Sequence, residues 1–398
     1  MEILFQYSAS RINSVDLSFK RFLRYKINWD NRLIAITGAR GVGKTTQILQ
    51  YIRENLTGEQ EKLIFVSLDD LYFAKNTLVS FAGEFVKRGG EFLFMDEVHK
   101  YKNWSQEIKS CYDYFSNLKM VVTGSSALEI YKGKADLSRR AIHYNMPGMS
   151  LREFIELKYQ IRFPVFALED ILTGAQDIIP EILEKIKPVR LFEEYLEYGY
   201  YPFFIEGEDA FHDKLRQTVN QVVETDLPAA APIDFSAVLS IKKLLSILAE
   251  IVPYKPNIVK LSQQVGVSRE TLIRYLYLLG NAELISLLQP DTHGISKMNK
   301  PDKVYLNNPN LIRALAPGHV NPGTVRETFF LNQLKVHHLV TASQKGDFMV
   351  DNKYVFEIGG HRKSKKQISD LENAFVAADN IEFARGNKIP LWLFGFLY

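Results

Sequence analysis

The sequence contains a single cysteine, Cys111, among 398 residues. One thiol cannot form an intramolecular disulfide, which excludes a disulfide-stapled secreted domain and fits a reducing compartment. No apolar run approaches the roughly 18 residues that cross a bilayer. The first residues, MEILFQYSASR, also lack the basic segment and apolar core of a signal peptide. We therefore expect a cytoplasmic protein with no membrane partner.

A large excess of one charge is also missing. The 49 Lys and Arg residues nearly balance the 46 Asp and Glu residues and leave a net charge of +3. This charge is too small to indicate a polyanionic partner, so any nucleic-acid surface must be local. The hydrophobic share of 46% and the charged share of 24% are those of a globular chain. The length predicts about two to four domains.

The stretch GARGVGKT, residues 38–45, matches the phosphate-loop pattern G-x-x-x-x-G-K-[ST] in full. An apolar run, RLIAIT, precedes it, and TTQILQYIREN follows with apolar residues at helical spacing. The glycines let backbone N–H groups surround phosphates, Lys44 reaches the β and γ phosphates, and the Thr45 hydroxyl binds Mg²⁺. We expect the following residues to bind ATP: Gly38, Ala39, Arg40, Gly41, Val42, Gly43, Lys44, Thr45 and Thr46.

A second apolar strand ends in acids in EFLFMDEVHK. Asp96 is expected to hold the metal, and Glu97 is placed to polarise an attacking water. A later run, NLKMVVTGSS, ends in hydroxyl groups at Thr123, Ser125 and Ser126. One of these could sense the γ-phosphate or the water, or the run could simply end a strand in a Gly-Ser turn.

Apolar runs near residues 32–37, 62–68, 92–96, 118–123 and 140–146 alternate with helical stretches. This order predicts an α/β fold with a largely parallel sheet covered on both faces. It is the pattern of an AAA-like P-loop NTPase of the additional-strand, catalytic-glutamate type. Charge on the transferred phosphoryl group also requires an arginine, from this chain or a neighbour, and the candidates are Arg139 and Arg140.

Residues 261–279, LSQQVGVSRETLIRYLYLL, have the spacing of a helix-turn-helix, with Gly266 at the turn and Ser268 as an N-cap. Apolar side chains at helical spacing predict a buried face, and ELISLL and KVYLNN are candidate strands of a wing. Between positions 260 and 303 the sequence has six basic residues and four acidic ones. This balance leaves two alternatives open: a surface that contacts duplex DNA, or a structural or protein-binding module. The possible DNA contacts are Arg269, Thr271 and Arg274.

The chain resembles the bacterial and archaeal AAA-type ATPases whose C-terminal half is a domain of uncharacterised function. The resemblance runs over nearly the whole length. It implies ATP binding, ATP hydrolysis with Mg²⁺, a winged helix and a restriction-endonuclease-like C-terminal fold. The matching pieces are ITGARGVGKTT, VSLDD, FLFMDEVHK, VVTGSS, SRRAIHYNMPGMSLREF, FEEYLEYGYYPFF, KLSQQVGVSRETLIRYLYLL, KVYLNN and GTVRETFFLNQL.

In the C-terminal part, GDFMVDNKYVFEIGG alternates like two strands joined by a turn at residues 351–353. Asp347 and Glu357 in this stretch, with Glu327 on the preceding helix, resemble the acidic set of restriction-like nucleases. Such a site places a lysine two residues beyond the last acid, where this chain has Gly359. The basic residues come later, at His361, Arg362, Lys363, Lys365 and Lys366, and one of these lysines could return to the site. We therefore expect a degenerate site without cleavage, with the basic run HRKSKK solvated or touching phosphate.

These observations predict four domains: an ATPase domain (1–150), a helical lid or connector (151–235), a winged helix-turn-helix (236–306) and a nuclease-like domain (307–398). Within the connector, FEEYLEYGYYPFF is expected to pack against the ATPase sheet, and LPAAAPID to be a linker. The leading hypothesis is a Mg²⁺-dependent ATPase coupled to DNA or to a protein client. A DNA-binding switch with incidental hydrolysis and an ATP-controlled nuclease are the alternatives.

Overall fold

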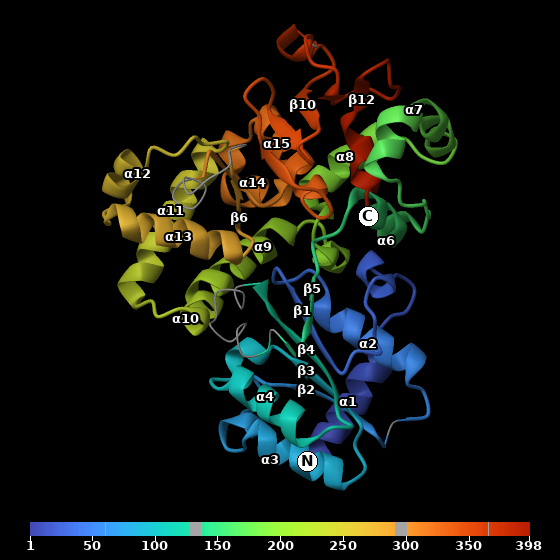
Figure 1. Ribbon diagram of the computed structural model, residues 1–398, viewed down its shortest axis with the longest axis vertical. Helices are drawn as coiled ribbons and strands as arrows, with labels where there is room; N and C mark the ends of the chain where they lie inside the picture. Colours follow the sequence, from blue (N-terminus) through green and yellow to red (C-terminus); the bar gives the residue numbers. More distant parts are fainter. Residues whose placement is uncertain (60, 127–136, 138, 291–300, 365) are drawn as a thin grey trace. The chain divides into compact units, whose positions relative to one another are not determined.

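Two units make up the fold, and the chain passes between them three times. Unit 1 comprises Met1–Pro147 and Gln221–Asp234, and unit 2 comprises Gly148–Asn220 and Phe235–Tyr398. The computed structural model describes residues 1–59, 61–126, 137, 139–290, 301–364 and 366–398 (Figure 1). Among these residues, no helix combines the length and the apolar composition that crossing a membrane requires.

A five-stranded sheet forms the centre of unit 1, with all neighbouring strands parallel. The order across the sheet is β2-β3-β4-β1-β5, so β4 lies between β1 and β3. This confirms the predicted parallel α/β sheet, and each strand falls within a residue or two of the expected run. The strands are β1 (Leu33–Gly38), β2 (Leu63–Ser67), β3 (Phe92–Asp96), β4 (Lys119–Ser125) and β5 (Ile142–Asn145).

Both faces of this sheet are covered. On one face, alternate residues such as Leu33 and Ala35 belong to a core shared with α3 and α4. The residues between them, Ile34 and Ile36, are also fully buried, as expected for strands covered on both sides. The helices of the first segment of unit 1 are α1 (Glu2–Ser14), α2 (Lys44–Asn55), α3 (Leu78–Lys87) and α4 (Trp104–Tyr114) (Figure 1).

The second segment of unit 1, residues 221–234, returns to this sheet domain after an excursion into unit 2. It contains one wide helical turn, η7 (Val222–Asp226), followed by the short helix α10 (Leu227–Ala230). The prediction of a linker here was wrong, because Leu227 and Ala230 are buried. The Pro-Ala composition suggested an extended chain, but proline is well tolerated in the first turn of a helix.

Unit 2 begins with helices that enclose an aromatic core. The segment FEEYLEYGYYPFF belongs to this unit rather than to the ATPase sheet. Tyr195 packs edge-on against Phe154 and Phe329 and donates a hydrogen bond to the Met149 carbonyl oxygen. The elements are α6 (Leu151–Tyr159), α7 (Leu168–Leu183), α8 (Pro188–Glu194), η5 (Tyr195–Gly199), η6 (Pro202–Glu206) and α9 (Phe211–Gln221).

The expected helix pair is present as α12 (Ile258–Val265) and α13 (Arg269–Asn281), preceded by α11 (Phe235–Ile251). Ser268 caps α13 by accepting a hydrogen bond from the Thr271 N–H, as predicted. Leu272, Leu276 and Leu279 form the buried face. Two short strands, β6 (Ile285–Leu288) and β7 (Lys303–Leu306), pair antiparallel after it.

The C-terminal part is a mixed sheet in the order β12-β11-β10-β9-β8. β9 and β10 pair antiparallel through a tight turn, and Asp351 and Asn352 both have positive φ there. The predicted hairpin is therefore confirmed. The elements are α14 (Pro309–Leu315), α15 (Pro322–Leu334), β8 (Val340–Ala342), β9 (Phe348–Val350), β10 (Tyr354–Gly359), β11 (Ala374–Ala378), β12 (Lys388–Pro390) and η11 (Leu391–Phe396) (Figure 1).

Candidate functional site

The loop between β1 and α2 has the conformation that phosphate binding needs. Gly41 and Gly43 have φ of 85° and 98°, a region that a side chain would strain. A Cβ on Gly38 would lie 2.3 Å from the Met146 carbonyl oxygen, so only glycine fits there. The loop ends at the N-terminus of α2, where the direction of the N–H groups and the partial positive charge of a helix favour an anion.

Lys44 lies inside this loop. Its ammonium group is buried and donates hydrogen bonds to the carbonyl oxygens of Gly38 (2.9 Å) and Ala39 (2.8 Å). These carbonyls begin the loop, so the lysine side chain reaches back from the start of α2 to the end of β1. A phosphate oxygen entering the loop would compete with these neutral acceptors for the ammonium, and a charged acceptor makes the stronger hydrogen bond.

Asp96, at the end of β3, receives two hydroxyl groups. Thr45 donates to Oδ2 at 2.8 Å, and Thr123 donates to Oδ1. Burial raises the pKa of Asp96, and the neighbouring Glu97 raises it further, against the effects of Thr123, Thr45 and Lys44. The carboxylate is thus brought together with the loop threonine, as predicted for a metal site.

These donors fit Mg²⁺. A hydroxyl oxygen and a carboxylate oxygen are hard ligands, and Mg²⁺ in nucleotide sites commonly uses one or two protein oxygens besides phosphates and water. The buried Asp96 carboxylate also gains from a nearby cation. Among the described residues no three His, Cys, Asp or Glu side chains form a metal cluster by themselves, and such a site does not need one.

Glu97 stands in the left-handed backbone conformation, at φ 54°, directly after β3. Its N–H donates to the Thr123 hydroxyl at 3.3 Å, so Thr123 bridges the two adjacent acids. Around its Oε2 lie Arg40 Nη1 (3.9 Å), His99 Nε2 (3.5 Å) and Lys100 Nζ (3.6 Å). The structure therefore surrounds this carboxylate with basic side chains, at the same strand edge as the loop.

The other two hydroxyl candidates lie at the end of β4. Ser125 is buried, and its backbone N–H points at His99 Nδ1 at 3.4 Å. Ser126 is also buried, and its hydroxyl has no hydrogen-bond partner among the described residues. Of the three, Thr123 is the one whose side chain joins Asp96.

The structure does not bring Arg140 to the phosphate loop of its own chain. Its guanidinium forms two hydrogen bonds of 3.0 Å with Asp113, near the end of α4. Arg32, which precedes β1, also contacts the end of α4 through the carbonyl oxygens of Tyr112 and Phe115. Arg140 therefore lies at the edge of the sheet where the strands begin, while the loop lies where they end.

Arg139 is exposed and makes no hydrogen bond or ion pair with a described residue. Arg140 is therefore paired with Asp113 in its own chain, and the expectation that one of these two arginines acts on the phosphate, from this chain or from a neighbour, stays a prediction. Sequence proximity suggested them, because both precede a strand of the same sheet. The arginine that the structure places beside Glu97 is Arg40, in the loop itself.

Two side chains that the sequence did not single out complete this region. His99 is buried, and its Nε2 lies 3.5 Å from both Glu97 Oε2 and Asp226 Oδ1. Asp226, in η7, accepts from Arg40 Nη1 at 3.1 Å. His99 lies three residues after Asp96 and could have been suspected. Asp226 lies 130 positions downstream of Asp96 in the chain, and no local pattern pointed to it.

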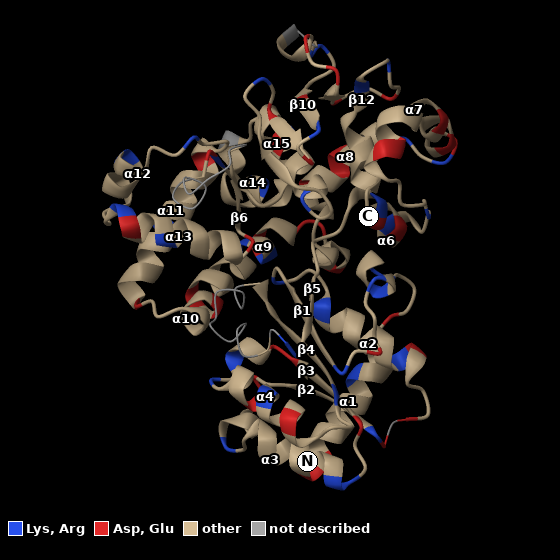
Figure 2. Cartoon of the chain, viewed as in Figure 1, with Lys and Arg blue, Asp and Glu red and all other residues tan. Residues whose placement is uncertain are grey.

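The predicted DNA contacts on α13 lie near its start. Arg269 and Arg274 are exposed, and Thr271 is half-buried next to the Ser268 cap. Figure 2 shows few basic residues on α12 and α13, with an acid beside the first of them on α13. Two of the six basic residues counted in the sequence, Lys297 and Lys300, lie in 291–300, outside the described residues.

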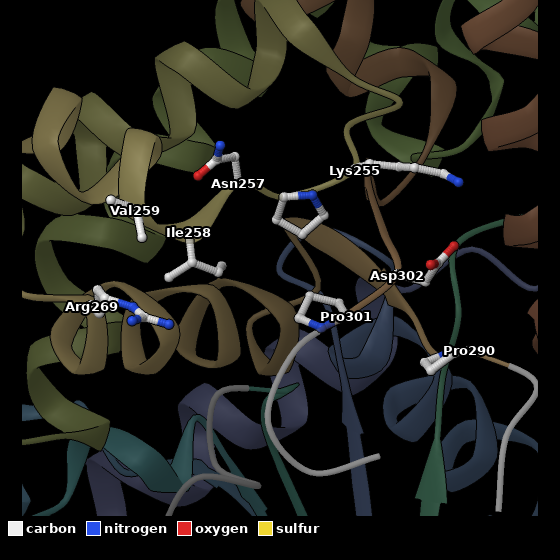
Figure 3. A pocket seen from close by; sticks show the side chains of 9 residues that line it. Lys255, Asn257, Ile258, Val259, Arg269, Pro290, Pro301 and Asp302 are labelled. Carbon is white, nitrogen blue, oxygen red and sulfur yellow. The ribbon is translucent and has the colours of Figure 1, made fainter. Parts of the chain in front are cut away.

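Arg269 also lines a hollow of about 570 Å³ between the start of α12 and the ends of β6 and β7. Figure 3 shows Arg269 at one end of it and Lys255 with Asp302 toward the other. Its border at Pro290 and Pro301 adjoins residues 291–300, which the structure does not describe.

The three acids of the C-terminal part come together. Glu327 is on α15, Asp347 precedes β9 and Glu357 is on β10, and the charge of Asp347 acts on both glutamates. Burial raises the pKa of Glu327, and Asp347 raises it further. Burial also raises the pKa of Glu357, and the ion pair with Lys363 opposes that shift.

The basic run HRKSKK was expected to be solvated or to touch phosphate, and one of its lysines instead forms this ion pair. Lys363 Nζ pairs with Glu357 Oε1. A Cβ on Gly359, the expected lysine position, would lie 2.7 Å from Cβ and Cγ of Lys363. The missing side chain of Gly359 thus makes room for a lysine that reaches the acid from further along the chain.

Comparison with known proteins supports part of this picture. Residues 30–155 match the family model of an AAA domain. Residues 189–319 match the model of a domain of unknown function. The uncharacterised protein MJ1637 of Methanocaldococcus jannaschii is 26% identical over 385 residues, which cover 89% of this chain and 80% of that protein.

Among solved structures, the Orc1 protein of Aeropyrum pernix in complex with DNA aligns with a TM-score of 0.32 and 11% identity, covering 80% of this chain and 92% of that one. Domain III of the replication initiation protein DnaA from Thermotoga maritima aligns with a TM-score of 0.25 and 13% identity, covering 49% and 89%. These scores are too low to place the chain in either structural family. The family model and the parallel sheet show that unit 1 carries an AAA-type P-loop domain, a nucleotide-binding fold.

Proposed function

We propose that the protein is a Mg²⁺-dependent ATPase that hydrolyses ATP to ADP and phosphate in unit 1. One observation carries the proposal: Thr45, Asp96, Thr123 and Glu97 form one connected set beside the phosphate loop. A site that only bound nucleotide would not need an acid next to the metal ligand, whereas a hydrolase needs a group that polarises water.

Each residue then has a role. The loop N–H groups and Lys44 bind the β and γ phosphates, and Thr45 with Asp96 holds Mg²⁺, which neutralises charge on those phosphates. Glu97 accepts a hydrogen bond from the attacking water and takes its proton as the oxygen bonds to the γ-phosphorus. The bond from that phosphorus to the β–γ bridging oxygen breaks, and the electron pair leaves with ADP. Thr123 forms hydrogen bonds with both Asp96 and Glu97 and so keeps the two acids in a fixed relative position.

Replacing Glu97 by Gln tests this role. The amide keeps the shape but is a poor proton acceptor, so kcat should fall at least about 100-fold while the affinity for ATP changes by no more than a few-fold. Phosphate release and equilibrium ATP binding measure the two quantities. Glu84→Gln is the matched control, because Glu84 lies exposed on α3 and its ion pair among the described residues is with Arg88. Unchanged turnover in Glu97→Gln would exclude Glu97 as the base.

We propose further that α11–α13 with β6 and β7 form a winged helix-turn-helix, which couples nucleotide turnover to a client or to DNA. The capped helix pair followed by a two-stranded hairpin supports this. The same phosphate-release assay with and without duplex DNA separates two readings. Stimulation favours a DNA-coupled ATPase. No change favours a protein client, and slow turnover under all conditions favours a switch whose hydrolysis is incidental.

A second candidate function, nucleic-acid cleavage by the C-terminal part, rests on Lys363. Restriction-like sites combine carboxylates that hold Mg²⁺ with a lysine that orients water or stabilises charge. Glu327, Asp347 and Glu357 would supply the carboxylates, although among the described residues they do not form a metal cluster as they lie, and Lys363 would supply the amine from further along the chain. The raised pKa values of Glu327 and Glu357 fit a site in which a divalent cation would stabilise the buried charges.

Supercoiled plasmid with Mg²⁺ or Mn²⁺ tests this candidate. If the site is active, the wild-type protein nicks the plasmid, and both Glu357→Ala and Lys363→Ala reduce nicking at least about 100-fold. Lys345→Ala serves as the control, because Lys345 pairs with Asp370 and not with the acid set. Nicking that survives in Lys363→Ala, or no nicking with either metal, rejects the candidate.

A further inference from the structure

Arg40 is the third residue of the phosphate loop, and all its described contacts are made by one nitrogen. Nη1 lies 3.1 Å and 3.3 Å from the two carboxylate oxygens of Asp226 and 3.9 Å from Glu97 Oε2. Within the part of the chain that the structure describes, Nη2 and Nε have no hydrogen-bond partner. The guanidinium is therefore held through Nη1, and the N–H groups of Nη2 and Nε are available to a ligand.

Asp226 is built to hold a cation. Its side chain is fully buried, whereas that of Arg40 is 22% exposed. Burial by itself raises the pKa of Asp226, but the close contacts with His99 and Arg40 outweigh it, and the pKa lies below its ordinary value. A buried carboxylate with a lowered pKa depends on its cationic partners, because without them its burial is costly.

His99 fixes the other side of this carboxylate. Its Nδ1 accepts a hydrogen bond from the Ser125 N–H, which leaves Nε2 as the ring nitrogen that faces the carboxylates. That nitrogen lies between Asp226 and Glu97, 3.5 Å from each. Asp226 and the proposed base thus flank the same imidazole nitrogen, without a hydrogen bond to it among the described residues, and both lie beside Arg40.

The position of Arg40 also follows from the chemistry. The attacking water must lie within hydrogen-bond reach of Glu97 and about 3 Å from the γ-phosphorus. Glu97 and the γ-phosphate must therefore both lie near the position of this water. The Arg40 guanidinium lies 3.9 Å from Glu97, and Arg40 belongs to the loop that would surround the phosphates. The guanidinium is therefore close to the position of this water. Phosphoryl transfer gains from a cation there, because negative charge spreads over the equatorial oxygens.

We propose that Arg40 supplies this cation in cis and that Asp226 is its positioning residue. The proposal rests on the proposed ATPase function and adds to it a transition-state role for Arg40, which the sequence identified only as a member of the phosphate loop. Asp226 keeps Nη1 and directs Nη2 and Nε at the γ-phosphate oxygens, and His99 keeps Asp226 and Glu97 in fixed relation.

One consequence concerns control of the site. Asp226 lies in residues 221–234, which the chain enters from 220 and leaves at 235, both in unit 2. Asp226, which positions Arg40, is therefore on a short segment of unit 1 that is joined to unit 2 at both of its ends. A change that draws η7 away from the sheet domain would lower turnover without touching the phosphate loop.

A double-mutant cycle tests the proposal with the full-length chain. Arg40→Ala should lower kcat about 100- to 1,000-fold, and Asp226→Asn about 10-fold, each with little change in the affinity for ATP. In the Arg40→Ala background, Asp226→Asn should have no further effect on kcat, because Asp226 acts through Arg40. Glu54→Gln is the control, since it breaks the ion pairs of Glu54 with Lys20 and Arg24 at the far end of α2.

Two further measurements distinguish positioning from folding. Binding of ADP with aluminium fluoride, which mimics the transferred phosphoryl group, should weaken in both single variants while binding of ADP alone does not. The melting temperature shows whether a variant is folded. If one single variant unfolds because a buried charge loses its partner, the double variant, which removes both charges, remains the test.

The outcomes are separable. If the wild-type protein hydrolyses ATP but Asp226→Asn leaves kcat and fluoride-analogue binding unchanged, Asp226 is not a positioning residue. An equal loss from Asp226→Asn with and without Arg40 would also overturn the proposal, because Asp226 would then act independently. If the wild-type protein does not hydrolyse ATP at all, the proposed function fails first.

Discussion

At the scale of single residues, Asp96 shows the conflict between stability and function in this site. Its carboxylate is almost fully buried, in a site that we propose binds a cation. Burial raises its pKa, with Glu97 adding to the shift, while two threonine hydroxyls and Lys44 offset it only in part. The folded protein thus carries a cost at Asp96 that a bound metal would relieve.

This cost predicts that Asp96→Asn stabilises the nucleotide-free protein. The folded-state pKa is raised above the unfolded value, so the folded state binds the proton more tightly and loses stability as pH rises through the raised pKa. At pH 8, thermal unfolding of unit 1 in Asp96→Asn should therefore occur about 2–4 °C higher, the shift typical of roughly 1 kcal/mol. The difference should shrink as the pH approaches 4.

Asp113→Asn is the control for this measurement, because Asp113 is exposed and pairs with Arg140. It should leave the melting temperature unchanged or slightly lower. A nucleotide-free Asp96→Asn protein that melts below the wild type at pH 8 would contradict the account, since Asp96 would then stabilise the empty site.

Also at this scale, the sequence identified residues whose role is local and missed those brought in from afar. Lys44, Thr45, Asp96 and Glu97 follow from short patterns, because a loop or a strand end fixes each of them relative to its neighbours. Asp226 lies 130 positions beyond Asp96, and its contact with Arg40 becomes apparent only when the chain has folded.

At the scale of elements, the strands and helices were largely predictable because burial imposes a simple pattern. Strands covered on both faces appear as continuous apolar runs, and all five runs of unit 1 became strands. The cap at Ser268 and the turn at Asp351–Asn352 follow from local hydrogen bonding and backbone preference.

The failures at this scale have a common cause. The segment 227–234 was expected to be a linker, and FEEYLEYGYYPFF was expected to pack on the ATPase sheet. Composition describes what a segment can do alone, whereas its place depends on which partner buries it. Leu227 is buried within unit 1, and Tyr195 is buried against Phe154 and Phe329 of unit 2.

At the scale of the whole molecule, the chain order does not follow the order of the units. Residues 221–234 complete unit 1, and in the sequence they come after the first segment of unit 2, residues 148–220. A truncation after residue 150, the boundary expected from the sequence, would remove Asp226 from the proposed ATPase site. The intact chain is therefore the form in which nucleotide chemistry should be measured.

The central claim is that unit 1 binds ATP through the phosphate loop and Mg²⁺. Its most direct test is equilibrium titration of the intact protein with ATP, with and without Mg²⁺, beside Lys44→Ala. We expect saturable binding that depends on Mg²⁺ and weakens at least about 30-fold in Lys44→Ala, because a buried charged hydrogen bond to phosphate is lost. No saturable binding by the folded wild-type protein, or equal binding by Lys44→Ala, would contradict the account.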